Sequence, residues 1–332
     1  MPEIQLNAAA CTGCGLCADF CPVSVFEMGS VDGRALPQVV HLEACWACQT
    51  CVGECPANAL RVVEVAQEQP ALAGGQAGNR QAETFAEPIG QEERLRYLEW
   101  ARTLQQVLGL RWSPVAISLI PADQPLPDVP HPPTRLRYCQ AMMAARRGKT
   151  MLMTVQDHAC PDGAHVLGLS EIPPKLASGE LYVRFEKLDN LEAARRMVNE
   201  RPHLEGRSMR ATLLAPLEKA VLPVDVVAVI AQPEQMMWLC MARSFFSGQR
   251  LTFHASGYNA QCAEVTALPY LTGELNLSLG CYGCRASSDV GDDLMFMGIP
   301  AAEMTSVVSG LKRLGRKVIG EERRKIYLPP WA

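Results

Sequence analysis

The chain has 332 residues, of which 48% are hydrophobic, enough for two domains with sizeable apolar cores. This composition excludes a collagenous or disordered chain. Lys and Arg number 31 against 35 Asp and Glu, a net charge of −4, which excludes a globally basic nucleic-acid-binding protein. The charge is uneven, because residues 1–60 carry six acidic residues and one base, Arg34, so an acidic head precedes a nearly neutral body.

The cysteines are also unevenly placed, since eight of the 14 lie between Cys11 and Cys55. They form two groups, CTGCGLCADFCP and CWACQTCVGECP, in which each cysteine recurs 34 residues later. Such a repeat predicts two similar units packed as a pair. Three cysteines at this spacing bind three corners of one 4Fe–4S cluster, and the fourth, followed by Pro, binds the other cluster. The predicted ligand sets are Cys11, Cys14, Cys17 and Cys55 for one cluster and Cys45, Cys48, Cys51 and Cys21 for the other.

A pair of zinc sites is the alternative, because paired C-x-x-C units also bind zinc. A four-ligand zinc site, however, gives no reason for a third evenly spaced cysteine and a Cys-Pro in each group. Residues 1–65 closely resemble the bacterial two-cluster ferredoxins. The resemblance implies two similar β-α-β-like halves and one-electron transfer at low potential. An acidic head holding negatively charged clusters predicts a redox partner protein with a basic docking patch.

Beyond the head, residues 66–92 are rich in Gln, Ala, Gly and Glu and predict a flexible linker. Residues 93–332 then form a body with alternating helical and extended patterns. Helices are predicted at 91–110, 138–147, 188–200, 233–246, 260–271 and 301–314, and strands at 114–120, 150–155, 210–214, 224–230 and 276–279. The whole predicts an α+β fold, a two-cluster ferredoxin-like head joined to a larger mixed α/β domain.

No membrane span is predicted from the sequence. The longest apolar stretch, residues 220–231, contains Pro223 and Asp225 and is shorter than the ~20 residues that a membrane helix needs. The chain also lacks an apolar leader with basic flanks. We therefore predict a cytoplasmic protein whose thiols are reduced or metal-bound.

Six further cysteines lie in the body. Cys281 and Cys284 lie on a glycine-flanked turn after an extended segment, Cys160 lies in a second loop, and Cys139 begins a helical segment. If these segments converge, Cys139, Cys160, Cys281 and Cys284 supply four thiolates for a third iron–sulfur cluster or a zinc ion. Packing as small hydrophobic residues is the alternative for all six, and it is favoured for Cys240 and Cys262.

Residues 93–320 resemble a prokaryotic family catalogued as domain of unknown function 169. The segments that carry the resemblance are YCQAMMAARRG, CPDGAHVLGL and NLSLGCYGCRASSDVGDDLMFMGIP. The resemblance implies that Cys139, Cys160, Cys281 and Arg285 are signature positions, whereas Cys284 does not map onto the family pattern. It implies positions for a site but no substrate.

Tethering a ferredoxin head to a body of this size favours electron transfer between the two, because a tether raises the effective concentration of the donor. We therefore predict an oxidoreductase, or a subunit of one, that passes low-potential electrons to a centre near Cys160 and Cys281. Arg285 is the candidate to hold a small anionic substrate, and Asp292 and Asp293 are candidates for proton donation. Two alternatives stay open: a non-catalytic electron-transfer adapter that docks on a larger enzyme, and a zinc- or redox-responsive module.

Overall fold

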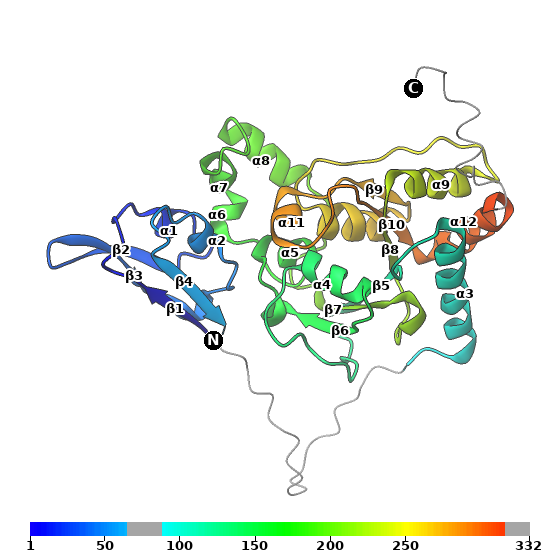
Figure 1. Cartoon of the computed structure of the whole chain (residues 1–332), viewed down its shortest axis with the longest axis horizontal. Helices are drawn as coiled ribbons and strands as arrows, with labels where there is room; N and C mark the ends of the chain where they lie inside the picture. Colours follow the sequence, from blue (N-terminus) through cyan, green and yellow to red (C-terminus); the bar gives the residue numbers. More distant parts are fainter. Residues whose placement is uncertain (65–87, 316–332) are drawn as a thin grey trace, which may run out of the picture.

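The computed structural model describes residues 1–64 and 88–315, and Figure 1 shows the head beside the larger body. The head contains two antiparallel strand pairs. Strand β1 (Pro2–Leu6) pairs with β4 (Leu60–Glu64), and β2 (Phe26–Val31) pairs with β3 (Arg34–Val39). The remaining elements of the head are short: helix α1 (Leu16–Asp19), a 3₁₀ turn (Leu42–Ala44) and helix α2 (Thr50–Gly53).

The body is built on a six-stranded antiparallel sheet with the strand order β6-β7-β5-β8-β10-β9. The strands are β5 (Val115–Pro121), β6 (Met151–Thr154), β7 (Met209–Pro216), β8 (Val226–Ala231), β9 (Asn276–Ser278) and β10 (Met295–Pro300). The sequence of strand β8, VVAVIA, is apolar at every position because both faces of the sheet are covered. Its Val226, Ala228 and Ile230 enter one core and its Val227 and Val229 enter the other, as the two-residue period of a strand requires.

Helices cover the two faces of this sheet. One face carries α3 (Gln91–Leu108), α9 (Pro233–Ser244) and α12 (Ala301–Leu314). The other carries α4 (Tyr138–Arg146), α5 (Pro161–Val166) and a π-helix (Ala260–Ala267), which continues into α10 (Leu268–Thr272). The body also contains the helices α6 (Pro174–Ala177), α7 (Glu180–Arg184), α8 (Leu191–Glu200) and α11 (Tyr282–Ser287).

The predicted fold class is confirmed, and each predicted body element is found, helix 301–314 with the predicted ends and the others with shifted ends. The prediction missed strand β10, the short helices α5, α6, α7 and α11, and the π-helical start of the segment 260–271. Most of the predicted linker 66–92 lies outside the described residues, and α3 begins at Gln91. The domain boundaries therefore stay predictions.

The π-helix lies unusually close to the sheet. A Cβ atom added to Gly298 in β10 would lie 2.0 Å from the carbonyl oxygen of Val265. Only glycine permits this approach, since any side chain would have to displace the π-helix backbone. Helices of this type often mark functional sites, and this one carries Gln261 and Cys262.

Candidate redox site

The eight head cysteines line two separate cavities. Cys11, Cys14, Cys17 and Cys55 line the first, and Cys21, Cys45, Cys48 and Cys51 line the second. These are the same two groups of four that the spacing predicts as ligand sets. Each cavity combines the first three cysteines of one group with the fourth cysteine of the other. The two groups of the repeat therefore exchange their fourth cysteines in space. Their role as ligands stays a prediction.

Backbone N–H groups point at the sulfur atoms in a repeated pattern. The amide of Val25 donates to Sγ of Cys21 over 3.3 Å, and the amide of Ala59 donates to Sγ of Cys55 over 3.3 Å. Both bonds span four residues and stand 34 residues apart in the chain. Such donors favour the thiolate form that an iron–sulfur cluster needs.

The head thiols fit a cluster better than a single metal ion. Among residues 1–64 and 88–315, no three His, Cys, Asp or Glu side chains converge on one point as ligands of one ion must. In a 4Fe–4S cluster each thiolate binds a different iron, so the four sulfur atoms are held further apart. Burial raises the pKa of the Cys51 thiol to about 12, so binding a cluster there displaces a proton.

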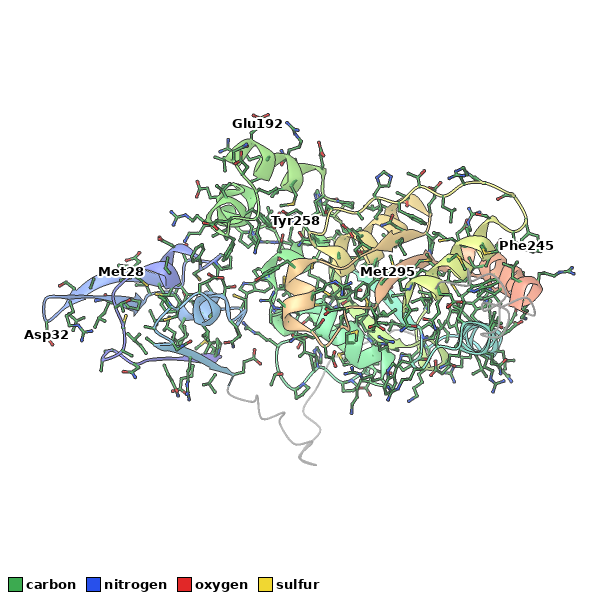
Figure 2. All side chains as sticks on the ribbon, turned by 45° about the horizontal axis from the view of Figure 1, so that its top comes forward. Met28, Asp32, Glu192, Phe245, Tyr258 and Met295 are labelled. Atoms are coloured by element: carbon green, nitrogen blue, oxygen red, sulfur yellow. The ribbon has the colours of Figure 1, made fainter. Side chains whose placement is uncertain are left out.

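A large cavity, of about 760 Å³, lies where the head meets the body. A volume of this size is typical of sites for cofactors and small molecules. Head residues such as Phe20 and Pro22 form one side, and the helices α5, α7 and α11 contribute to the other. Tyr258, which contributes to its wall, lies beside the small helical lobe, formed by helices α6, α7 and α8 and including Glu192 (Figure 2).

Five body cysteines line this cavity: Cys139, Cys160, Cys262, Cys281 and Cys284. Two of them begin helices, because Cys160 is the N-cap of α5 and Cys281 is the N-cap of α11. Their Sγ atoms accept backbone N–H bonds from Gly163 over 3.4 Å and from Cys284 over 3.3 Å. The four cysteines that the sequence analysis expects to converge therefore do line one cavity, and their function stays a prediction.

The cavity thiols interact with one another. A hydrogen bond with Cys284, followed by burial, raises the pKa of the Cys281 thiol, and a hydrogen bond with Cys139 is the main cause of the raised pKa of Cys284. Burial raises the pKa of Cys160 to about 11. The side-chain amide of Gln261 donates to Sγ of Cys284 over 2.6 Å. These raised pKa values favour the protonated thiol form of Cys160, Cys281 and Cys284.

A polar network lies beside the thiols. Asp162 forms a buried ion pair with Arg201 and accepts hydrogen bonds from Tyr182 and Asn259. The amide nitrogen of Asn259 lies 2.7 Å from the Asp162 carboxylate. This network fixes the start of the π-helix, which follows Asn259, against helix α5, which contains Asp162.

Basic side chains of the body contact the acidic head. Nη2 of Arg137 donates to the carbonyl of Cys48 over 2.8 Å, and the guanidinium of Arg135 donates to the carbonyl of Cys45. Lys175 Nζ donates to the carbonyl of Ala18 over 3.0 Å. An ion pair between Arg184 and Asp19, 3.0 Å long, and stacked rings of Phe20 and Phe185, 4.6 Å apart, complete the contact. The body thus presents a basic surface to the head.

Other predicted site residues lie away from the cavity. The guanidinium of Arg285 donates to the carbonyls of Leu279, Gly291 and Leu294, so it ties a loop together and offers no support for the predicted role in anion binding. Asp293 accepts a bond from Gln232 over 2.7 Å, and neither Asp292 nor Asp293 lines the cavity, which gives the predicted proton donation no support either.

Two residues that matter here were missed by sequence reasoning. Cys262 lies in the buried apolar core, as its apolar helical segment predicts, but it also lines the cavity near Cys160 and Cys281, which the sequence does not predict. Gln261 carried no motif at all. The sequence does contain a signal for both residues. Gln261 and Glu264 are polar residues beside Cys262 in an otherwise apolar helical segment, and buried helices rarely carry such residues.

The part of the chain that the structure describes has no helix long and apolar enough to cross a membrane. A family model described as "4Fe-4S dicluster domain" matches residues 10–59, and a model described as "Uncharacterised ArCR", domain of unknown function 169, matches residues 103–310. The predicted fusion of a ferredoxin head to such a body is confirmed, and the head supports an iron–sulfur electron-transfer role.

Two proteins of Methanocaldococcus jannaschii are similar to separate parts of the chain. An uncharacterised protein is 28% identical over 217 residues, covering 64% of this chain and 93% of its own length. An uncharacterised ferredoxin is 33% identical over 60 residues, covering 18% of this chain and 77% of its own length. No solved structure matches the chain.

Proposed function

The chain belongs to the family described as uncharacterised ArCR, domain of unknown function 169, and we propose that it is an iron–sulfur oxidoreductase, or a subunit of one, whose dicluster head delivers electrons to the thiol-lined cavity of the body. When bound, two 4Fe–4S clusters supply two carriers of single electrons at low potential. The proposed ligand sets are the two groups of four head cysteines that line the two head cavities.

One observation carries this proposal: the second head cavity and the large cavity share a wall. Cys48, together with Pro22, Gln49 and Thr50, lines both. A group held by Cys48 is thereby next to the space that the body thiols enclose. The first head cavity shares none of its lining residues with the large cavity, so the cysteines around Cys48 form the proposed exit for electrons.

Charge supports the same docking. The head is acidic, and clusters bound by four thiolates add further negative charge. Arg135, Arg137, Lys175 and Arg184 of the body all contact the head. We propose that the body itself is the basic redox partner predicted for the ferredoxin, with any further partner protein supplying electrons from outside. As part of this proposal the protein is cytoplasmic, the compartment in which thiols stay reduced or metal-bound.

A third iron–sulfur cluster or a zinc ion held by Cys139, Cys160, Cys281 and Cys284 is the predicted form of the acceptor. The shared cavity supports a role for these thiols. A zinc ion stays the alternative to a cluster here, because four thiolates also form a tetrahedral zinc site. Catalysis by Cys160 and Cys281 remains part of the proposal, since both Sγ atoms stand at helix starts on the cavity wall.

Reductive titration of the full chain tests the proposal. The anaerobic protein should contain about eight irons or more, and two clusters alone should take up about two electrons. With its thiols first oxidised by diamide, we expect the wild-type chain to take up more than about two electrons, and Cys281→Ser to take up fewer than wild type, with Cys240→Ser as the control. Cys240 lies in α9 in the other core and does not line the cavity. An uptake of about two electrons by the wild-type chain would instead support the adapter function.

A further inference from the structure

Cys281 and Cys284 form a C-x-x-C pair at the start of helix α11. Cys281 is the N-cap, and its Sγ accepts the backbone N–H of Cys284 over 3.3 Å. This bond folds the two residues into one tight turn with both thiols on the cavity. Two thiols of a C-x-x-C pair that contact each other in one turn can close to a disulfide with little backbone movement.

The two thiols differ in access. Cys284 is 1% exposed, whereas Cys281 is partly exposed to the cavity. An attacking thiol must reach its substrate, and a resolving thiol must lie behind it. Cys281 therefore suits the first role and Cys284 the second.

Polar groups around Cys284 can stabilise its sulfur when it becomes a thiolate. Nε2 of Gln261 donates to its Sγ over 2.6 Å, and the hydroxyl of Ser288 lies 3.8 Å from it. A hydrogen bond to an ionised sulfur is stronger than one to a neutral thiol, so the amide stabilises the thiolate that forms when the disulfide is opened. The π-helix positions this amide, because Gln261 is its second residue.

The number of electrons also fits, on the premise of the proposed function. A disulfide needs two electrons, and a head with two clusters supplies two carriers of one electron each. A single one-electron acceptor would need only one such carrier at a time.

We propose that Cys281 and Cys284 are a redox-active dithiol, that the head reduces its disulfide, and that the dithiol in turn reduces a disulfide-containing molecule bound in the cavity. In the first half-reaction the Cys281–Cys284 S–S bond accepts two electrons and two protons and becomes two thiols. In the second, Cys281 attacks a sulfur of the substrate disulfide and releases the first substrate thiol. Cys284 then displaces the second substrate thiol, which restores the Cys281–Cys284 bond, and the two protons leave with the substrate.

The test uses the full chain, purified without oxygen and treated with the thiol oxidant diamide. Free thiols are then alkylated, and the peptides are analysed by mass spectrometry. We expect a disulfide between Cys281 and Cys284 in the wild type and in the control Cys240→Ser, and none in Cys284→Ser. Reductive titration of the oxidised wild type should take up about four electrons with about eight irons per chain, two for the clusters and two for the disulfide. In Gln261→Leu, reduction of the disulfide should slow about tenfold or more, because a charge-assisted hydrogen bond is lost.

The outcomes separate this inference from the proposed function. An uptake of about three electrons with about twelve irons means a third cluster, which overturns the dithiol and keeps electron delivery to the body. A disulfide that forms but leaves uptake at about two electrons supports the dithiol and overturns delivery by the head. Absence of the Cys281–Cys284 disulfide after diamide treatment overturns the inference.

Discussion

At the scale of residues, the 34-residue repeat imposes the same unusual backbone twice. Positive φ angles occur at Gly13 (71°) and Ala47 (51°), which are equivalent positions before the second cysteine of each group. The next pair, Gly15 and Gln49, behaves in the same way. A residue with a Cβ atom adopts this conformation at a cost of about 1–2 kcal/mol. The second copy accepts that cost, so the cysteine geometry and not local preference sets the backbone.

Equivalent cysteines of the repeat should differ in function, because only one of the two head cavities faces the body. Cys14→Ala and Cys48→Ala should each lower the iron content from about eight to about four per chain. Only Cys48→Ala should also stop electrons from reaching the body thiols, since Cys48 lines both the second head cavity and the large cavity. Iron analysis and electron uptake measure the two effects.

The same pair of variants contains its own control. Each removes a thiol from one of two equivalent positions, so any general damage to the head should affect both alike. Full iron in Cys14→Ala would contradict the ligand assignment. Equal loss of body reduction in both variants would contradict the exit through the second cavity.

At the scale of elements, the body should be sensitive to any side chain added at the contact between β10 and the π-helix. Gly298→Ala places a Cβ atom against the Val265 carbonyl and should destabilise the body by about 1–3 kcal/mol, the usual effect of overpacking. Thermal unfolding should therefore begin at a lower temperature, and the position of Gln261 and Cys262 should be disturbed. Gly90→Ala is the matched control, because nothing lies within 4 Å of its added Cβ. Equal unfolding midpoints for the two variants would count against the close contact.

Which elements were predictable follows from how local their signals are. The two cysteine groups can be predicted as ligand sets because each set of spacings lies within a dozen residues. Strand β8 can be predicted because its run VVAVIA is apolar throughout. Cys262 cannot be placed in this way, because inside an apolar helical segment a thiol facing a cavity and a thiol facing a core have the same neighbours in sequence. The position of Cys262 depends on the π-helix, and the wider turn of a π-helix gives no recognisable period in the sequence.

At the scale of the whole molecule, contacts between head and body come from distant parts of the chain. Arg135 and Arg137 precede helix α4, whereas Lys175 and Arg184 belong to the small helical lobe. In Figure 1 this lobe stands beside α1 and α2 of the head. No local pattern predicts such contacts, so the sequence indicates a basic partner, whereas the basic surface of the body that faces the head is seen only in the structure. The contacts hold the second head cavity against the thiol-lined cavity.

The contacts of the two arginines should therefore control the rate of electron delivery without affecting cluster binding. In Arg135→Gln/Arg137→Gln the charged donors to the carbonyls of Cys45 and Cys48 are lost. Hydrogen bonds from charged groups contribute about 1.5–3 kcal/mol, so in the diamide-oxidised chain reduction of the Cys281–Cys284 disulfide should slow about tenfold or more, while iron stays at about eight per chain.

Arg147→Gln is the control for that double variant, because its ion pair with Asp289 lies within the body. Rapid mixing with dithionite, followed by quenching and thiol labelling, measures the rate. High salt should slow the wild type only slightly, since the exposed ion pair of Arg184 with Asp19 is weak, whereas the stacked rings of Phe20 and Phe185 are not screened. A double variant as fast as Arg147→Gln would mean that electrons reach the body thiols without the docked head, and the shared wall at Cys48 would then have no part in their path.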